Sequence, residues 1–362
     1  MSTDAASVVI DTGSAITKAG LSGEEAPSVM LPTVLGRPRS ETQGVYIGAE
    51  AQAKRDILDL SYPVSRGHFT NWDDVEQIWR HIYDNELHLS PTAQPLLMSV
   101  SPSFTTEEFE KMGQILFESF QVPSLYFEMS SKLSMFGAGA TSGIVLEIGE
   151  GVTHAVPIIE GAELTHAIRR VDFGGHDVTE YLRKSLADRG HDLDFSTVQD
   201  IKEKLAYVAL AGESEPYYNH YIKRTYELPD GTVIDVENER FMCAETLFYP
   251  PWAGSDQPGV HTAMYDSIMK CEVDVRRTFY HSMYVAGASS QLDQITDRVN
   301  KEMRSLGPDC HMRCFRCPEP KFSAWYGGSI LASLSTMESF WLKKAEYEEA
   351  GASIFSRQTK YR

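Results

Sequence analysis

A short sequence pattern occurs twice in this chain and constrains its fold more than any other feature. The first copy, residues 8–19, reads Val-Val-Ile-Asp-Thr-Gly-Ser-Ala-Ile-Thr-Lys-Ala. The second copy, residues 144–155, reads Ile-Val-Leu-Glu-Ile-Gly-Glu-Gly-Val-Thr-His-Ala. Each has three apolar residues typical of a buried strand, then an acidic residue, a spacer and a glycine. Each continues with an apolar residue, Thr, a basic or imidazole side chain and Ala, which indicates two strand–turn units built alike.

The residue types in the repeat suit a phosphate chain with a divalent ion. Gly13 and Gly149 allow tight turns, and turn amides that point the same way form a cradle for an anion. Asp11 and Glu147 stand just before the turns, where a carboxylate can hold Mg²⁺ through water. Lys18 can reach a phosphate as a point charge.

An alternative interpretation is that both copies are ordinary β-hairpins with glycine in the turn. A single copy would favour that interpretation, whereas two copies favour duplicated lobes that face one phosphate chain. The chain has no Gly-x-x-x-x-Gly-Lys-Ser/Thr string, which argues against a P-loop enzyme.

Length and charge narrow the protein classes further. A chain of 362 residues exceeds one ordinary core and predicts two domains or lobes. Its 51 acidic and 33 basic residues give a net charge of −18, which argues against direct binding of nucleic acid. No stretch approaches the roughly 18 apolar residues of a membrane helix, and residues 1–10 do not form a signal peptide. We therefore expect an intracellular protein that does not bind membranes.

Periodicity in the rest of the chain predicts alternating strands and helices, and hence α/β layers around a mostly parallel sheet. A polar, exposed loop is expected over residues 36–48, and a hairpin over 226–236 that turns at Pro229-Asp230-Gly231. Thr105 is a candidate helix cap. Apolar residues at helical spacing predict helices over 72–87, 105–120, 178–187, 196–210 and, after Gly327-Gly328, 331–341.

Several longer strings carry a family resemblance. They are Ile10-Asp11-Thr12-Gly13-Ser14, Lys18-Ala19-Gly20, Gly36-Arg37-Pro38, Asn71-Trp72-Asp73-Asp74, Gly149-Glu150-Gly151-Val152-Thr153-His154, Asp200-Ile201-Lys202-Glu203-Lys204, Tyr226-Glu227-Leu228-Pro229-Asp230-Gly231, Ser267-Ile268-Met269-Lys270-Cys271 and Gly327-Gly328-Ser329-Ile330-Leu331-Ala332-Ser333-Leu334. By these strings the chain resembles the actin superfamily from residue 8 to residue 356. Hexokinases and Hsp70 chaperones share the fold of that superfamily but not these strings.

The resemblance implies an α/β, actin-like fold, in which a ribonuclease H-like unit is duplicated and two lobes enclose a nucleotide cleft. The first, smaller lobe would comprise residues 1–137 and 322–362, and the second residues 138–321. The implied cofactor is ATP or ADP with Mg²⁺, or with Ca²⁺ as the alternative ion, and the implied metal ligands are Asp11 and Glu147.

The resemblance also implies a set of nucleotide contacts. Those to the phosphates are Gly13, Ser14, Ala15, Ile16 and Lys18 from one side, and Gly149, Glu150, Gly151 and Val152 from the other. Those around ribose and adenine are Gly175, Lys202, Glu203, Gly287 and Lys321. His154 is expected near the attacking water. Without the family string, Lys202 and Glu203 would be interpreted as a solvated helix face.

The expected hydrolytic centre differs from that of actins. Glu147 and Glu150 stand where actins have aspartate, and Ser130 stands where actins have the glutamine that helps position water. An added methylene moves a carboxylate by about 1 Å, and a misplacement of that size can cost roughly 100-fold in rate. With Ser130, Glu147 and His154 as candidate catalytic residues, the sequence predicts that nucleotide binding is kept while hydrolysis is slow or lost.

Surfaces that actins use to polymerise differ as well. Residues 40–45 are all that remains of the long loop by which actin subunits contact each other. Residues 255–257 replace the apolar tip of the actin plug with Ser-Asp-Gln. Residues 212–225 form a stretch that is shorter than in actins and rich in tyrosine. A groove for other actin-like subunits or actin-binding proteins is retained, and core packing is the alternative interpretation of its apolar members. Its residues are Phe136, Gly139, Thr141, Ile330 and Leu331.

The five cysteines are odd in number and mostly bunched, which predicts reduced thiols. The string from Cys310 to Cys317, with Cys314 and His311 between them, allows a zinc site. On an extended strand, Cys310 and Cys314 would share one face. No second cysteine pair follows at the spacing of a zinc finger.

These expectations leave three functional hypotheses. The first is an actin-like, ATP-binding filament subunit or filament-associated protein of the cytoplasm and cytoskeleton, at most a weak ATPase. The second is a non-polymerising subunit of a larger assembly of the dynactin, axonemal dynein or chromatin-remodeller type, for which the nucleus is an alternative location. The third, a sugar kinase of the same fold, has no sugar-binding motif to support it.

Overall fold

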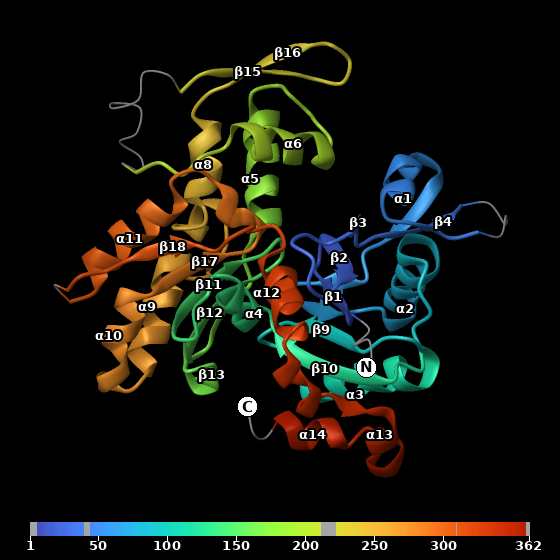
Figure 1. Cartoon of the computed structure of the whole chain (residues 1–362). Coiled ribbons are helices and arrows are strands. Elements are labelled where there is room, and N and C mark those ends of the chain that lie inside the picture. Colours follow the sequence, from blue (N-terminus) through green and yellow to red (C-terminus); the bar gives the residue numbers. More distant parts are fainter. Residues whose placement is uncertain (1–5, 40–43, 211–221, 309, 360–362) are drawn as a thin grey trace. The chain divides into compact units, whose positions relative to one another are not determined.

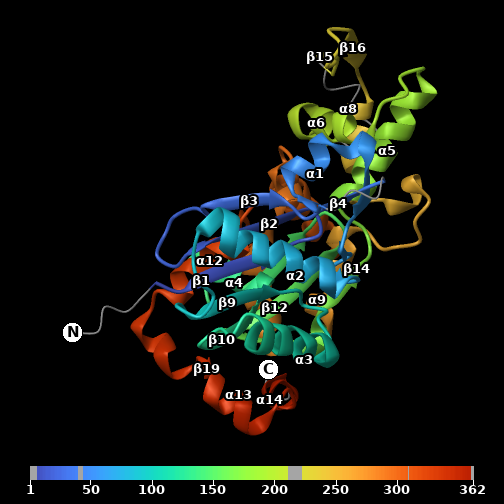
Figure 2. The same cartoon turned by 90° about the vertical axis from the view of Figure 1, so that its right-hand side faces the viewer.

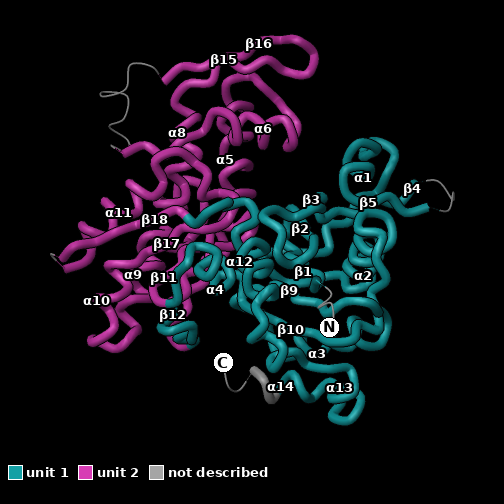
Figure 3. Tube along the Cα trace, in the orientation of Figure 1, with its two compact units in different colours: residues 1–141, 158–165, 317–362 teal, residues 142–157, 166–316 magenta. Residues whose placement is uncertain are grey.

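The computed structural model describes residues 6–39, 44–210, 222–308 and 310–359 (Figure 1). Part of the predicted short loop and most of the tyrosine-rich stretch therefore lie outside the described residues. The chain forms two compact units (Figure 3). Unit 1 comprises Met1–Thr141, Ile158–Thr165 and Cys317–Arg362, and unit 2 comprises Ser142–Pro157 and His166–Arg316.

The main sheet of unit 1 has six strands in the order β19-β10-β9-β1-β2-β3. Strands β10, β9 and β1 are parallel, whereas β2, β3 and β19 pair antiparallel. The expectation of a mostly parallel sheet is wrong here, because a glycine turn joins β1 directly to β2 and a tight turn can connect only antiparallel strands. The strands are β1 (Val8–Thr12), β2 (Ile16–Leu21), β3 (Val29–Pro32), β9 (Leu96–Val100), β10 (Ser124–Met129) and β19 (Leu342–Lys343).

The two faces of β1 are buried against different helices, as the period of two in a strand requires. Val8 and Ile10 belong to a cluster with residues of α2, α3 and the C-terminal helices. Val9 points the other way, into a cluster with Leu133 of α4 and Trp325 of α12. The unit 1 helices are α1 (Ala49–Ala53), α2 (Trp72–His81), α3 (Thr106–Gln114), α4 (Ser130–Gly137), α12 (Ser323–Ala332), α13 (Lys344–Ala350) and α14 (Ile354–Thr359).

The helices predicted over 72–87 and 105–120 are confirmed, and each ends in a π-helical segment, η2 (Ile82–Leu87) or η3 (Ile115–Ser119). Thr105 is the predicted cap: its hydroxyl accepts from the Glu108 amide at 3.3 Å, and the Glu108 carboxylate accepts from the Thr105 amide at 2.8 Å. This reciprocal pair satisfies two amides that a helix start leaves free.

Helix α12 differs from its prediction. Gly327 and Gly328 lie inside it, and it ends at Ala332; a 3-10 segment, η8 (Ser335–Ser339), follows. A Cβ on Gly327 would overlap the carbonyl oxygen of Leu133 in α4. Gly327 therefore allows two helix backbones to touch, and neither glycine marks a helix start. Figures 1 and 2 both show α12 beside α4.

Residues 36–48 are not a plain exposed loop. They contribute to a three-stranded sheet in the order β5-β4-β6, which packs with α1 around the buried residues Val34, Ala51 and Leu58. The buried Asp74 of α2 anchors this sheet, because its carboxylate accepts from Arg37, from Ser61 at 2.5 Å and from Asn71 at 2.9 Å. The remaining unit 1 elements are β4 (Leu35–Pro38), β5 (Tyr46–Ile47), η1 (Arg55–Ile57), β6 (Leu58–Ser61), β7 (Val64–Ser65), β8 (His68–Phe69) and β13 (Ala162–Glu163).

The second sheet has the order β13-β12-β11-β17-β18, with β14 beside β12. Here β11, β17 and β18 are parallel. Its strands and those of the separate hairpin are β11 (Gly143–Ile148), β12 (Thr153–Ile159), β14 (Arg169–Val171), β17 (Met283–Ala286), β18 (Cys314–Arg316), β15 (Arg224–Glu227) and β16 (Val233–Val236). The helical elements are η4 (Thr165–Ala167), α5 (Gly175–Asp188), α6 (Phe195–Leu205), α8 (Glu239–Glu245), η6 (Pro250–Ala253), α9 (Val260–Lys270), α10 (Val273–His281), η7 (Ala288–Gln291) and α11 (Ile295–Leu306).

The predicted hairpin over 226–236 is confirmed by β15 and β16, but the helix predicted over 196–210 ends early, at Leu205. Beyond it, Ala206 is extended and Tyr207 forms a bridge with Asp293. Nearby, Arg298 is 7% exposed and donates to Glu245 at 2.8 Å and to the carbonyl of Ala209 at 2.6 Å. Tertiary contacts thus outweigh the helical pattern of residues 206–210.

Across the described ranges, no helix is both long and apolar enough to span a membrane.

Candidate functional site

The first copy of the repeat forms a tight turn between β1 and β2 in unit 1. The Gly13 amide donates to the Ile16 carbonyl at 3.1 Å, which closes the turn. A Cβ at Gly13 would lie 3.0 Å from that same oxygen, so a larger residue would force the turn to shift. The indole of Trp79 donates to the Thr12 hydroxyl at 3.0 Å and holds the end of β1.

The charged residues of this copy form an ion pair. Asp11 and Lys18 stand opposite each other on β1 and β2, and the Lys18 Nζ lies 2.9 Å from the Asp11 Oδ2. Each side chain is 13% exposed. An ammonium and a carboxylate are therefore fixed together beside the turn, where little water screens them.

The turn residues between the strands are held by two other segments of unit 1. The Ala15 carbonyl accepts from the Thr33 amide at 2.8 Å. The Ser14 hydroxyl accepts from the Gly67 amide at 3.4 Å. The backbone of residues 13–15 is thus positioned before any ligand binds, which lowers the entropy cost of binding one.

The second copy of the repeat forms a matching turn between β11 and β12 in unit 2. The Gly149 amide donates to the Val152 carbonyl at 3.0 Å, and a Cβ at Gly149 would lie 3.0 Å from that oxygen. The two copies therefore share the same closing hydrogen bond and the same need for glycine. Gly151 lies in the turn as well.

The start of α5 packs directly against this second turn. The Gly175 amide donates to the Gly149 carbonyl at 3.0 Å, and the His176 amide donates to the Glu150 carbonyl at 2.8 Å. Two amides at the start of a helix, which have no partner inside it, are thus used to fix the turn.

Polar side chains gather around Gly175. The Lys202 Nζ donates to the Gly175 carbonyl at 2.9 Å and lies 4.0 Å from the Glu150 Oε2. A Cβ on Gly175 would lie 2.6 Å from the Glu150 carboxylate and 2.7 Å from the Ser289 hydroxyl, which itself donates to the Gly149 carbonyl at 3.4 Å. The structure therefore brings Gly149, Glu150, Gly175 and Lys202 together.

Ser289 belongs to this group and was missed by sequence reasoning. It stands two residues after Gly287, which follows β17 and has a φ of +84°. Glu147 on β11 pairs in register with Ala286 on β17, so Glu147 and Gly287 lie at the carboxyl ends of adjacent parallel strands. Ligands of α/β proteins commonly bind at such ends. The sequence signal that could have identified Ser289 is a polar residue shortly after a strand and the glycine that follows it.

Two predicted residues of unit 2 have different surroundings. His154 is 3% exposed and stands opposite Arg170 in the β12–β14 pairing. Glu203 is exposed on α6, and its carboxylate accepts from Gln199 at 3.0 Å. The side chains of these two consecutive residues therefore point in different directions: Lys202 points into the polar group around Gly175, and Glu203 faces away from the core.

Helix α6 also holds the β15–β16 hairpin by hydrogen bonds. The Tyr226 hydroxyl donates to Asp200, and this bond raises the pKa of Tyr226 to about 12. Burial tends to raise the pKa of Asp200, but hydrogen bonds from Lys204 and Tyr226 outweigh it and leave that pKa lowered. Asp200 is therefore a structural anion that fixes the hairpin to α6.

The remaining predicted site residues lie in unit 1. Ser130 is the first residue of α4 and is buried. Lys321 is exposed and stands shortly before α12. Lys321 therefore belongs to unit 1 with Ser130 and the Asp11–Lys18 turn, whereas the other residues predicted around ribose and adenine belong to unit 2. Those residues are Gly175, Lys202, Glu203 and Gly287.

The predicted partner surface, which we call the α4–α12 surface, also lies in unit 1. Gly139 and Thr141 are exposed, Phe136 and Leu331 are half-buried, and Ile330 is 37% exposed.

No group of three or more His, Cys, Asp or Glu side chains in the described ranges could hold a metal ion. The zinc site considered for residues 310–317 is therefore not formed among these residues, of which only Cys314–Arg316 form a strand. All five cysteines are thiols outside any disulfide, as predicted. Burial raises the pKa of Cys243 to about 12, which makes it inert at neutral pH.

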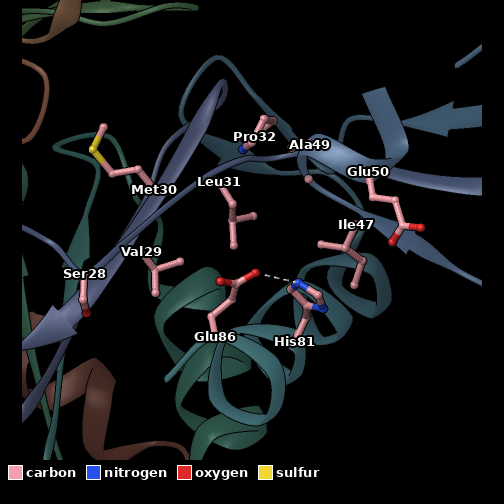
Figure 4. A pocket seen from close by; sticks show the side chains of 11 residues that line it. Ser28, Val29, Met30, Leu31, Pro32, Ile47, Ala49, Glu50, His81 and Glu86 are labelled. Atoms are coloured by element: carbon pink, nitrogen blue, oxygen red, sulfur yellow. Dashed lines mark hydrogen bonds and ion pairs between the residues drawn. The ribbon is translucent and has the colours of Figure 1, made fainter. Parts of the chain in front are cut away.

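A separate pocket of about 370 Å³ lies in unit 1 between β3, β5 and the end of α2. Val29, Leu31 and Ile47 line it, together with His81 and Glu86, whose side chains are 3.1 Å apart (Figure 4). None of the predicted nucleotide residues lines this pocket.

A protein-family model described as Actin matches residues 2–196 and 193–360, which together span nearly all of the sequence.

Proposed function

Because the chain belongs to the actin family, we propose that it is an actin-like, ATP-binding protein of the cytoskeleton, either a filament subunit or a filament-associated protein. The observation that carries the proposal is the duplicated turn. Gly13 and Gly149 donate to carbonyls three residues later at 3.1 and 3.0 Å, and a Cβ at either position would lie 3.0 Å from the same oxygen. Two matching backbone cradles suit one polyphosphate ligand.

The residues present fit ATP or ADP with a divalent ion, Mg²⁺ or alternatively Ca²⁺. The backbone of residues 13–16 and 149–152 would hold phosphate oxygens, and Lys18 would supply a positive charge. Asp11 and Glu147 would each hold the ion through water, which suits the hydrated chemistry of Mg²⁺. Gly175, Lys202, Glu203, Gly287 and Lys321 would surround ribose and adenine, and the two lobes would be residues 1–137 with 322–362, and 138–321.

We expect hydrolysis to be slow or lost. Phosphoryl transfer depends mainly on the positioning of the attacking water and of the metal. Ser130 is short and buried at the start of α4, and Glu147 is one methylene longer than aspartate. His154 is the remaining candidate that could lie near the water.

A second function is supported by the connection between β4 and β5. These strands pair at Gly36 and Tyr46, so residues 37–45 are all that joins them. At about 3.6 Å per residue, a chain of this length can extend out and back by roughly 16 Å at most. In unit 2, Gln257 of the altered plug accepts from the Asp172 amide at 3.1 Å and is therefore already engaged. Both features favour a non-polymerising subunit of a larger complex, in the cytoplasm or the nucleus.

Nucleotide binding tests the first part of the proposal. Saturating Mg-ATP should raise the melting temperature of the unmodified chain by mass action. Lys18→Ala should reduce that rise, whereas Lys54→Ala should not, because Lys54 pairs with Glu50 on the surface of α1. An unmodified chain whose melting temperature does not respond to Mg-ATP contradicts the proposal.

Assembly distinguishes the two functions. Purified protein in Mg-ATP and potassium salt would be examined by sedimentation and electron microscopy. Long filaments at low micromolar concentration would support the filament subunit. Soluble protein that co-purifies from its own cells with a fixed set of partners would support the complex subunit.

A further inference from the structure

Ser99 on β9 is a buried serine whose hydroxyl has no hydrogen-bond partner among the described residues. The residue is 5% exposed, and its Oγ is buried. Most buried hydroxyls in native proteins are hydrogen-bonded, because a buried donor or acceptor without a partner lowers stability. A hydroxyl that stays unpaired inside a folded chain therefore calls for an explanation in what the chain binds.

Ser99 stands between two carboxylates in the main sheet of unit 1. It pairs in register with Asp11 of β1 on one side and with Glu128 of β10 on the other. In-register residues of neighbouring strands project to the same face of a sheet. Two residues earlier on that face, Val9 and Leu97 pack into the cluster with α4 and α12. The apolar layer of this face is therefore followed by a polar row.

The polar row lies where ligands of α/β proteins usually bind. Asp11, Ser99 and Glu128 are each the last residue but one of their strands, and the three strands are parallel. The row is thus at the carboxyl ends of β1, β9 and β10, the edge of an α/β sheet at which ligands commonly sit. Asp11 also belongs to the repeat, so the row adjoins the turn of residues 13–16.

Both carboxylates of the row are paired with lysines, which explains why neither accepts from Ser99. The Asp11 Oδ2 lies 2.9 Å from the Lys18 Nζ. The Glu128 Oε2 lies 2.9 Å from the Lys132 Nζ. Of these two pairs, only Asp11–Lys18 stands beside the turn that is expected to hold phosphate. A phosphate that attracts Lys18 leaves Asp11 and Ser99 together as groups that can bind a hydrated cation.

The second copy of the repeat has no equivalent hydroxyl. Glu147 on β11 pairs in register with Ala286 on β17, whose side chain is a methyl group. The two acids expected at the ion therefore differ in their neighbours on the next parallel strand. Asp11 has a hydroxyl beside it, and Glu147 does not.

We propose that Ser99 is a positioning residue for the divalent ion, and that its hydroxyl accepts a hydrogen bond from a water molecule bound to that ion. Mg²⁺ keeps several of its waters in proteins, so a hydroxyl beside a carboxylate can contribute without direct ligation. The inference rests on the proposed function, because it assumes that the repeat binds a nucleotide with this ion. It adds that the ligand-free chain is less stable for keeping this hydroxyl, a cost that proteins often accept at functional sites.

The first test measures stability without any nucleotide. Ser99→Ala removes the hydroxyl and leaves the rest of the side chain. Ser134→Ala is the matched control, because Ser134 is a buried serine of the same unit whose hydroxyl lies 2.9 Å from that of Ser323. In urea denaturation, Ser99→Ala should have a midpoint equal to or above that of the unmodified chain, since it removes an unsatisfied group. Ser134→Ala should lower the midpoint, because it leaves the buried Ser323 hydroxyl without this partner.

The second test measures the binding of ATP by calorimetry, once with Mg²⁺ and once in EDTA. Ser99→Ala should weaken the binding of Mg-ATP about threefold to tenfold, the range expected for the loss of one hydrogen bond. It should leave the affinity for ATP in EDTA unchanged, because the hydroxyl acts through the ion. Ser134→Ala should change neither affinity.

Three outcomes overturn the inference. They are a lowered urea midpoint for ligand-free Ser99→Ala, an unchanged affinity of that variant for Mg-ATP, and an equal loss of affinity with and without Mg²⁺. The last outcome would place the hydroxyl on the phosphates and not on the ion. An unmodified chain that does not bind Mg-ATP would refute the proposed function and this inference with it. If the unmodified chain binds Mg-ATP and Ser99→Ala binds it equally well, only the role of Ser99 is refuted.

Discussion

Replacing Gly327 by alanine tests how closely two helices of unit 1 approach. A Cβ at this position would overlap the Leu133 carbonyl oxygen and lie 3.1 Å from the Gly137 amide nitrogen, and both are backbone atoms of α4. Backbone cannot rotate away as a side chain can. Helices α4 and α12 would therefore have to separate, which opens the buried cluster around Trp325 and Leu133.

Gly328→Ala is the matched control in the same helix. Its Cβ would lie 3.0 Å from Val9 Cγ1 and 3.2 Å from Leu97 Cδ2, which are side-chain atoms that can shift. Both substitutions gain about 1 kcal/mol in helix propensity. Overpacking typically costs 1–3 kcal/mol and more where backbone must move, so Gly327→Ala should lower the free energy of unfolding by about 2–3 kcal/mol. Gly328→Ala should remain within about 1 kcal/mol of the unmodified chain.

Urea denaturation followed by tryptophan fluorescence measures both variants. Trp325 is fully buried in α12 and donates to the Val9 carbonyl at 3.0 Å, so its emission reports on this packing. A stability difference appears as a shift of the urea midpoint at constant slope. Equal midpoints for the two alanine variants would refute the backbone contact as the reason for glycine at position 327.

Three further predictions concern catalysis, acid stability and a buried ion pair. The double change Ser130→Gln with Glu147→Asp should raise ATP turnover above that of the unmodified chain in a phosphate-release assay. If the unmodified chain already hydrolyses ATP as fast as polymerised actin, our account of both residues is contradicted. Burial raises the pKa of Asp74, but hydrogen bonds from Arg37 and Ser61 outweigh it, so the folded pKa lies below the usual value. Ionised Asp74 therefore contributes its full stability above the unfolded-state pKa near 4, and this contribution is lost as the pH falls through the folded-state pKa. Asp74→Asn should reduce the pH dependence of the urea midpoint in this acidic range. Arg298→Met should cost about 3–5 kcal/mol, because it leaves Glu245 buried without a partner, and adding Glu245→Gln should recover part of this loss in the same denaturation assay.

The sequence correctly predicted the elements that are determined by residues close together in the chain. The strands of the repeat, the cap at Thr105 and the turn at Pro229–Gly231 depend on side chains within a few residues, and the structure confirms them. The expectation of a mostly parallel sheet failed because a sequence in which strands alternate with helices does not show that a hairpin adds antiparallel strands to the sheet. Helix α12 was misplaced because Gly327 packs against the backbone of Leu133, a residue far away in the sequence.

The candidate site shows the same limit. The repeat identified Asp11, Lys18 and both glycines, whose chemistry is visible in a short string. Ser289 lies beside Gly175 only through folding, and its one local signal was its position two residues after Gly287, which follows β17. Glu128 and Glu163 are acids, a residue type that is mostly exposed in folded proteins, yet the fold buries both. Side-chain charge alone therefore does not predict exposure.

The core of unit 1 closes only with residues near the end of the chain. Tyr347 and Phe355 share one buried cluster with Val8 and Phe117, and the rings of Phe117 and Tyr347 stack 4.6 Å apart. A ribosome adding roughly 5–20 residues per second needs about 20–70 seconds to proceed from Val8 to Phe355. Until Phe355 has been added, this apolar cluster is incomplete, so unit 1 cannot complete its core before that point of translation.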